Sequence, residues 1–259
     1  MGVAAARPVR APVTRFHIRP EAVRGDRVTF DAEETHHLAR VLRLKAGAVV
    51  RTVDGRGHEL TVRLTRIGAR AAEGDIVECA VRASESPLSL TLAQGIPKGE
   101  KLEAIIRMAT ELGVGRVIPL LCERTIARPD PKEPSHRLLR WRRVAKEAAK
   151  QSGRAVIPDV RPPITLGEWL TEPPPPGLLL CLWEGERTPL ATVLPGSPPA
   201  RATVVVGPEG GLTDEEARSL RSAGALLAGL GPRILRTETA GPVALALLQS
   251  RYGDLGSRE

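Results

Sequence analysis

One segment of the chain has the residue types of a small-ligand site: Gly-Pro-Glu-Gly-Gly at 207–211. It follows an apolar run at 202–206 and precedes a helix that Thr213 and Glu216 are predicted to cap. Glycines at such a turn let backbone amides approach a bound molecule, and parallel sheets hold ligands where their strands end. The segment matches neither glycine pattern of dinucleotide and nucleoside triphosphate sites. We therefore predict a ligand site of another kind, with an empty tight turn as the alternative.

A second segment, 230–240, carries polar groups that a reaction would use: two arginines, Glu238 and two threonines. It is predicted to join the last strand of the chain to its last helix. Because parallel strands end at the same edge of a sheet, both segments are expected to line one site. The alternative is a polar loop in which Thr237 or Thr239 caps the last helix, and the two interpretations are compatible.

The segment 137–154 is strongly basic. Seven positive charges stand against the single Glu147, a net of +6. Most charged stretches are only solvated helix faces, but this one is not interleaved with acidic residues. It therefore favours phosphate binding.

The whole chain is basic as well. Its 259 residues include 38 Lys and Arg against 30 Asp and Glu, a net charge of +8, which predicts attraction to a polyanion such as nucleic acid. Three Trp, two Phe and one Tyr are too few for a platform that stacks many bases. An RNA partner would be held mostly through its phosphates and shape.

Other classes of protein are disfavoured. No apolar run approaches the roughly 20 residues that span a membrane, and the first residues lack the apolar core of a secretory signal. Three isolated cysteines fit a reducing cytoplasm, where we expect the protein. The adjacent His36 and His37 have no further metal ligand nearby, so no metal site is predicted. No Gly-x-Ser-x-Gly or Ser/His/Asp set supports acyl-enzyme chemistry.

The chain is predicted to form two domains after a disordered extension at 1–13. Residues 14–83 have the texture of a small β-rich domain, with one helix capped by Asp31. Residues 88–253 alternate apolar strands with helices, which predicts an α/β domain built on a parallel sheet. The strands are expected at 14–19, 27–30, 48–54, 58–67, 75–82, 90–93, 116–121, 155–160, 177–183, 202–206 and 225–230. The main helices are expected at 98–112, 135–151, 214–223 and 240–252.

Several short motifs follow one another along the chain. They are Arg15-Phe16, His36-His37-Leu38, Pro97-Lys98-Gly99, the segments 110–114, 123–125 and 147–154, and the two segments 207–212 and 230–240. With them the sequence closely resembles the bacterial 16S rRNA (uracil-N3)-methyltransferase family of the SPOUT superfamily. The resemblance spans residues 14–252.

The resemblance implies a fold, a cofactor and partners. The fold would be a SPOUT-type α/β methyltransferase domain with a deep trefoil knot, preceded by a small PUA-like β-barrel that binds RNA. S-adenosylmethionine would bind in the knot, and the chain would act on 16S rRNA of the small ribosomal subunit as a homodimer. A SPOUT enzyme for another RNA position, or a non-catalytic assembly factor, is the alternative.

The resemblance also assigns roles to residues. The cofactor-binding residues would be Leu182, Glu184, Gly207, Pro208, Glu209, Gly210, Gly211, Leu230, Gly231, Ile234, Leu235 and Arg236. The resemblance and the charge of the basic segment 137–154 together give the expected RNA-binding residues, which are Arg15, His37, Arg40, Arg43, Lys98, Arg124, Arg140, Arg143, Lys150 and Arg154.

The chemistry of the substrate suggests the catalytic groups. Uracil N3 is a weakly acidic imide that is nucleophilic mainly as its anion. Arg236 is the natural donor to the charge on O2 and O4. Glu209 or Glu238 would accept the proton, although either would serve equally as a structural residue.

Overall fold

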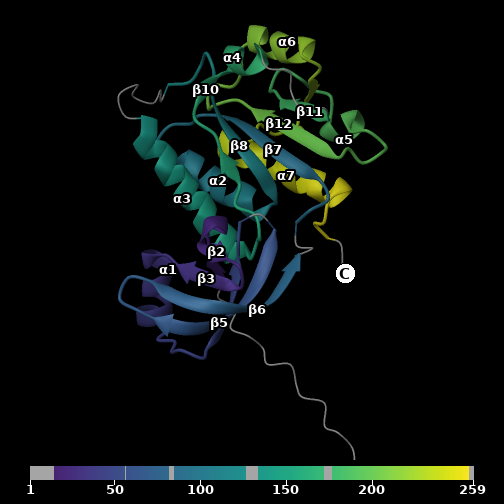
Figure 1. Ribbon diagram of the computed structural model, residues 1–259. Coiled ribbons are helices and arrows are strands. Elements are labelled where there is room, and N and C mark those ends of the chain that lie inside the picture. Colours follow the sequence, from purple (N-terminus) through teal and green to yellow (C-terminus); the bar gives the residue numbers. More distant parts are fainter. Residues whose placement is uncertain (1–14, 56, 82–84, 127–133, 172–176, 257–259) are drawn as a thin grey trace, which may run out of the picture. The chain divides into compact units, whose positions relative to one another are not determined.

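The computed structural model describes residues 15–55, 57–81, 85–126, 134–171 and 177–256 (Figure 1). The chain divides into two units, Met1–Ser84 and Glu85–Glu259. The predicted extension at 1–13 lies outside the described residues. Each unit has its own sheet and its own hydrophobic core.

The N-terminal unit is a six-stranded sheet with the order β1-β4-β5-β6-β3-β2. Its strands are β1 (Arg15–His17), β2 (Val23–Arg24), β3 (Arg27–Phe30), β4 (Val49–Val53), β5 (His58–Ile67) and β6 (Ala72–Val81). Among the described strand pairs of this sheet, only β1–β4 is parallel. The helical turns are η1 (Pro20–Ala22), α1 (Ala32–His36) and the π-helical η2 (His37–Val41). Every strand predicted here is confirmed, and β2 is an addition.

The alternation of side chains along β5 explains this core. Leu60, Val62 and Leu64 are buried and face the same side, because successive strand residues point to opposite faces. They pack with Phe16 and Phe30, whose rings meet edge to face with centroids 6.1 Å apart.

The C-terminal unit is built on a parallel sheet with the order β10-β8-β7-β12-β11-β13, and β9 pairs with β8. Its strands are β7 (Ser89–Gly95), β8 (Val114–Leu121), β9 (Asp159–Val160), β10 (Ile164–Thr165), β11 (Leu178–Leu182), β12 (Arg201–Val206) and β13 (Leu226–Ala228). Its helices are α2 (Lys101–Glu111), α3 (Pro134–Ser152), α4 (Leu166–Thr171), α5 (Leu190–Val193), α6 (Asp214–Ser222) and α7 (Thr237–Tyr252). This is the predicted α/β class, and the trefoil knot stays a prediction.

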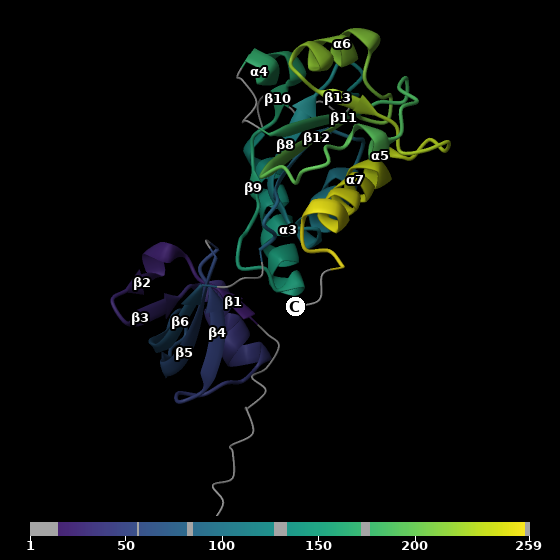
Figure 2. The same ribbon diagram turned by 90° about the vertical axis from the view of Figure 1, so that its right-hand side faces the viewer.

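Both faces of this sheet are covered, which is why its strands are apolar throughout. Val204 belongs to the core shared with α2, α3 and α7, whereas its neighbour Val205 packs on the side of α4 and α6. The two helical layers are visible on opposite sides of the sheet in Figures 1 and 2. None of the helices in the described residues is long and apolar enough to cross a membrane.

Two helices begin elsewhere than predicted. Helix α2 begins at Lys101 rather than Lys98, because Gly99 has a left-handed backbone (φ +63°) that a helix does not accept. Helix α7 begins at Thr237, three residues before the predicted start. Its N-cap is Arg236, in extended backbone, so the prediction that Thr237 or Thr239 caps the helix is wrong. The Thr237 hydroxyl is bound elsewhere, as described below.

One predicted strand is much shorter than expected. Only Asp159–Val160 forms a strand, and Val156 makes an isolated bridge, where a strand over 155–160 was predicted. The backbone amides of Ala155 and Val156 donate instead to the carboxylate of Glu85. These two residues therefore serve to hold the beginning of the C-terminal unit.

Candidate active site

A cleft of about 520 Å³ lies at the carboxyl ends of β11, β12 and β13. These strands are neighbours in the sheet, so the segments that follow them come together although they are distant in the sequence. The walls are formed by residues 182–186, 206–212 and 228–238. The cleft has the size of a small-molecule site and the place where parallel sheets bind ligands.

Every residue predicted to bind the cofactor lines this cleft, and so does Glu238. Sequence reasoning missed other lining residues, among them Lys101, Trp183, Leu212 and Thr237. Trp183 could have been found from its place between Leu182 and Glu184. Lys101 gave no such signal, because it comes from α2, far away in the sequence.

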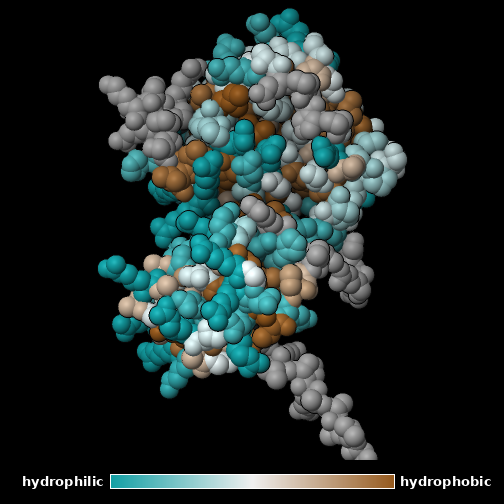
Figure 3. Space-filling model, in the orientation of Figure 1, coloured by the Kyte–Doolittle hydropathy of each residue, from teal (hydrophilic) through white to brown (hydrophobic). Residues whose placement is uncertain are grey.

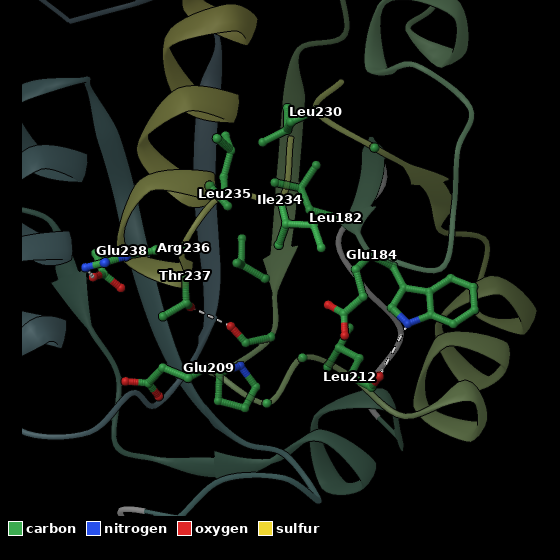
Figure 4. A pocket seen from close by; sticks show the side chains of 18 of the residues that line it. Leu182, Glu184, Glu209, Leu212, Leu230, Ile234, Leu235, Arg236, Thr237 and Glu238 are labelled. Atoms are coloured by element: carbon green, nitrogen blue, oxygen red, sulfur yellow. Dashed lines mark hydrogen bonds and ion pairs between the residues drawn. The ribbon is translucent and has the colours of Figure 1, made fainter. Parts of the chain in front are cut away.

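The middle of the cleft is apolar. Figure 4 shows Leu182, Leu230, Ile234 and Leu235 gathered there, with Glu184 on one side and Glu209, Arg236 and Glu238 on the other. Ile234 is 89% exposed, an unusual state for a large apolar side chain beside other apolar residues. The arrangement suits a ligand with an apolar body and charged groups.

The glycine segment has little room for side chains. A Cβ on Gly211, whose φ is +70°, would collide with the Glu184 carboxylate, and a Cβ on Gly207 would lie 2.8 Å from the carbonyl carbon of Gly211. Arg124 braces the segment, because its Nη1 donates to the Gly210 carbonyl oxygen at 2.9 Å. Arg124, which the sequence assigned to RNA, thus has a contact within the site.

A buried hydrogen-bond network joins two walls of the cleft. The Thr237 hydroxyl donates to the Gly207 carbonyl oxygen at 2.6 Å. Nε2 of Gln94, at the end of β7, donates to Thr237 Oγ1 at 2.8 Å and to the same carbonyl oxygen at 3.3 Å. Gln94 is fully buried. A glutamine within an apolar strand was the only sequence signal for this network.

Charged groups gather on one side of the cleft. Glu209 accepts hydrogen bonds from the Lys98 amide at 3.0 Å and from Lys101 Nζ at 2.9 Å. Burial raises the pKa of Glu209, but the hydrogen bonds from Lys101 and from backbone amides outweigh burial, so the pKa lies below its ordinary value. The hydrogen bond to Glu209 raises the pKa of Lys101.

Comparison with known proteins decides the family. The profile of a family described as an RNA methyltransferase domain matches residues 84–249, and that of an RNA methyltransferase PUA domain matches residues 30–77. A Synechocystis relative, named ribosomal RNA small subunit methyltransferase E, is 37% identical over 91% of this chain and 77% of its own length. The chain belongs to the ribosomal RNA small subunit methyltransferase E family.

Other related proteins agree in sequence and fold. The Bacillus subtilis protein of that name is 33% identical over 83% of this chain and 87% of its own length. The crystal structure of the Neisseria gonorrhoeae methyltransferase E, bound to S-adenosylmethionine, has a TM-score of 0.83 and 34% identity. The match covers 93% of this chain and 98% of the N. gonorrhoeae chain. A putative methyltransferase from Legionella pneumophila, in complex with the same cofactor, has a TM-score of 0.84 and 33% identity, over 95% of this chain and 100% of the other.

Six of the RNA contacts predicted for this methyltransferase E family member are exposed: Arg40, Arg43, Lys98, Arg124, Arg140 and Arg143. Arg40 lies on η2 and Arg43 just after it, in a unit whose face in Figure 3 is mostly hydrophilic. Arg143 lies on α3. Exposed guanidinium and ammonium groups are the usual contacts to a phosphate backbone.

Several predicted RNA contacts already have partners within the chain. The ion pairs are Arg140 with Glu100 (2.6 Å) and Glu103 (2.8 Å), Arg15 with Glu59 (3.3 Å), and Lys150 with Glu147 (3.7 Å). The His37 ring packs on Phe16, with centroids 5.5 Å apart. Their contribution to RNA binding stays a prediction.

The predicted RNA contact at Arg154 is wrong. Arg154 is 6% exposed, and each guanidinium nitrogen donates inside the protein. Its partners are the carboxylate of Glu85 and the carbonyl oxygens of Thr110 and Val114. A buried charge that is paired in this way holds the fold and is not accessible to a phosphate.

Proposed function

We propose that this protein transfers the methyl group of S-adenosylmethionine to N3 of a uridine in 16S rRNA. The observation that carries the proposal is the meeting of two glycine-containing walls with Arg236 at one cleft. Membership of the methyltransferase E family supports the rRNA substrate, and the cofactor bound in the related N. gonorrhoeae structure supports the methyl donor. The choice of N3 follows the motif resemblance at 230–240.

The cleft fits the cofactor by shape and by charge. The apolar side chains of Leu182, Leu230 and Leu235 would contact the flat, apolar part of the ligand, and Glu184 would attract its positive charge. Gly207 and Gly211 keep the backbone accessible, because a Cβ on either would fill or distort the cradle. When bound, S-adenosylmethionine supplies an electrophilic methyl group on a sulfonium centre.

Arg236 would act on the uracil. Its side chain is 85% exposed at the cleft, with Nη1 4.0 Å from Glu238 Oε1, a separation too long for a tight ion pair. The guanidinium is therefore accessible to a substrate base. As the N3 proton leaves, negative charge develops on O2 and O4, and a planar donor that meets an imide edge would stabilise that charge.

Glu209 is better suited to holding the glycine segment than to removing the N3 proton. Its carboxylate accepts from the Lys98 amide and from Lys101, and these contacts bring its pKa below the ordinary value. A lowered pKa makes a carboxylate a weaker proton acceptor at neutral pH. Glu209 would then fix the position of the backbone at 207–211.

The remaining parts of the proposal concern partners. The PUA match at 30–77 and the exposed Arg40 and Arg43 support RNA binding by the N-terminal unit. Arg143 on α3 adds a further positive charge.

The family resemblance supports a homodimer, a knotted C-terminal domain and a place in the cytoplasm, where ribosomes are assembled. Sedimentation of the purified protein tests the dimer.

The experiment that tests the function uses the purified protein, methyl-labelled S-adenosylmethionine and small ribosomal subunits from a strain that lacks the modification. The RNA is digested to nucleosides, which are separated and identified by mass spectrometry against 3-methyluridine and 2′-O-methyluridine standards. Label in 3-methyluridine is expected. Label in the 2′-O-methyl nucleoside would assign another RNA position, and cofactor binding without any label would indicate a non-catalytic assembly factor.

A further inference from the structure

Lys101 contacts carboxylates from two different walls of the cleft. Its Nζ lies 2.9 Å from Glu209 Oε1 and 3.7 Å from Glu238 Oε2. Glu209 belongs to the glycine segment and Glu238 to the first turn of α7. Lys101 itself opens α2, so a third element supplies the cation between them.

Glu238 lies between two cations. Its Oε2 is buried and faces Lys101, and no hydrogen bond to this oxygen is found among the described residues. Its Oε1 lies 4.0 Å from Arg236 Nη1. The Lys101 side chain is 40% exposed and that of Arg236 is 85% exposed, so the lysine is the more confined cation.

Removal of the lysine charge would change this balance. Glu238 would keep a buried oxygen with Arg236 as its nearest charged neighbour on the described part of the cleft. An unpaired buried carboxylate is costly, and a carboxylate accepts two parallel hydrogen bonds from a guanidinium readily. The exposed Arg236 side chain is free to turn toward Glu238. In that position its donors would be occupied by the carboxylate.

We propose that Lys101 is a positioning residue that holds Glu238 away from Arg236 and so keeps the guanidinium available to the substrate. The proposal rests on the proposed function, because it takes Arg236 to be the group that meets the uracil. Lys101 touches neither the base nor the reacting atoms in this account. It acts through one carboxylate.

A double-mutant cycle between Lys101 and Glu238 tests the proposal in single-turnover methylation of small subunits. Lys101→Met is expected to lower the rate by about tenfold, the scale of coupling between charged neighbours. In the Glu238→Gln background the same change is expected to have almost no effect, because no carboxylate remains to occupy Arg236. Rates are measured at saturating S-adenosylmethionine, with affinity followed by calorimetry, because Lys101→Met also removes the hydrogen bond to Glu209, which holds the glycine segment.

Two further variants separate this role from a general one. Lys101→Arg keeps the positive charge and should retain most of the rate. Lys101→Met combined with Glu209→Gln removes the other carboxylate, and at saturating cofactor it should be no faster than Lys101→Met alone.

The proposal is overturned if Lys101→Met is as fast as the wild type, or if it slows both backgrounds equally. Inactivity of Glu238→Gln would also overturn it, because Glu238 would then be needed for the reaction itself. Failure of the proposed function would give a different result: the wild type would form no 3-methyluridine, or Arg236→Ala would match the wild-type rate. The cycle is therefore measured beside those two proteins.

Discussion

The Thr237 hydroxyl donates a 2.6 Å hydrogen bond to the carbonyl oxygen of Gly207, thirty residues earlier in the chain. This bond ties the first residue of α7 to the end of β12, and both groups are buried against Gln94. The two walls that carry the proposed cofactor contacts are thus joined below the cleft. Movement of one wall would disturb the other.

Replacement of Thr237 by Val should therefore affect both stability and binding. It leaves the Gly207 carbonyl without its shortest hydrogen bond, at a cost of about 1–3 kcal/mol in the free energy of unfolding. Loss of this bond should also disturb the alignment of the two walls and so weaken S-adenosylmethionine binding by about tenfold. Urea unfolding and calorimetry measure the two effects. Thr239→Val, on the exposed side of the same helix, is the matched control and should change neither.

Gly211 should be required for the shape of the cradle. Gly211→Ala and Gly224→Ala both place a side chain on left-handed backbone, with φ +70° and +91°, and should each cost about 1–2 kcal/mol of stability. Only the first also meets the Glu184 carboxylate, whereas no atom lies within 4 Å of a Cβ at Gly224. Cofactor affinity should fall in Gly211→Ala alone. Equal affinities in the two variants would refute a role for this glycine in binding.

Arg236 should contribute to the rate more than to binding. Arg236→Ala is expected to lower single-turnover methylation by roughly 10²–10³-fold, the scale for loss of one donor to developing charge. Affinities for the cofactor and for rRNA should change far less, and Arg236→Lys should restore little because a point charge does not replace a planar fork. Arg233→Ala removes a neighbouring charge for comparison. Parallel losses of rate and cofactor affinity would make Arg236 a structural residue.

Arg143 should contact the RNA backbone. Arg143→Gln is expected to weaken rRNA binding and to reduce the slope of log affinity against log salt by about one. Arg140→Gln, on the same helix, should have a smaller effect because Glu100 and Glu103 already neutralise that charge. Filter binding over a series of salt concentrations gives both slopes. Identical slopes for the wild type and Arg143→Gln would show that this side chain is only solvated.

Local features were predictable from the sequence because they depend on neighbouring residues. Thr213 and Glu216 form the predicted capping box, as the Thr213 side chain accepts from the Glu216 amide and the Glu216 side chain accepts from Thr213. β5 occupies the predicted residues because apolar and polar side chains alternate along it. The glycine segment was identifiable in the same way, from an apolar strand before it and a helix cap after it.

The tertiary structure decided which charged residues meet. Arg154 belongs to a basic segment, but folding brings it against Glu85, 69 residues away, and buries the pair. Lys101 reaches Glu209, 108 residues away, and thereby joins a site that no motif near it announces. Most elements, the family and the segments at the cleft were predictable from the sequence, since they follow from local periodicity, caps and motifs. Long-range packing decides which cations pair inside the protein and which stay accessible. A long flexible side chain pairs with the partner that the fold brings within reach.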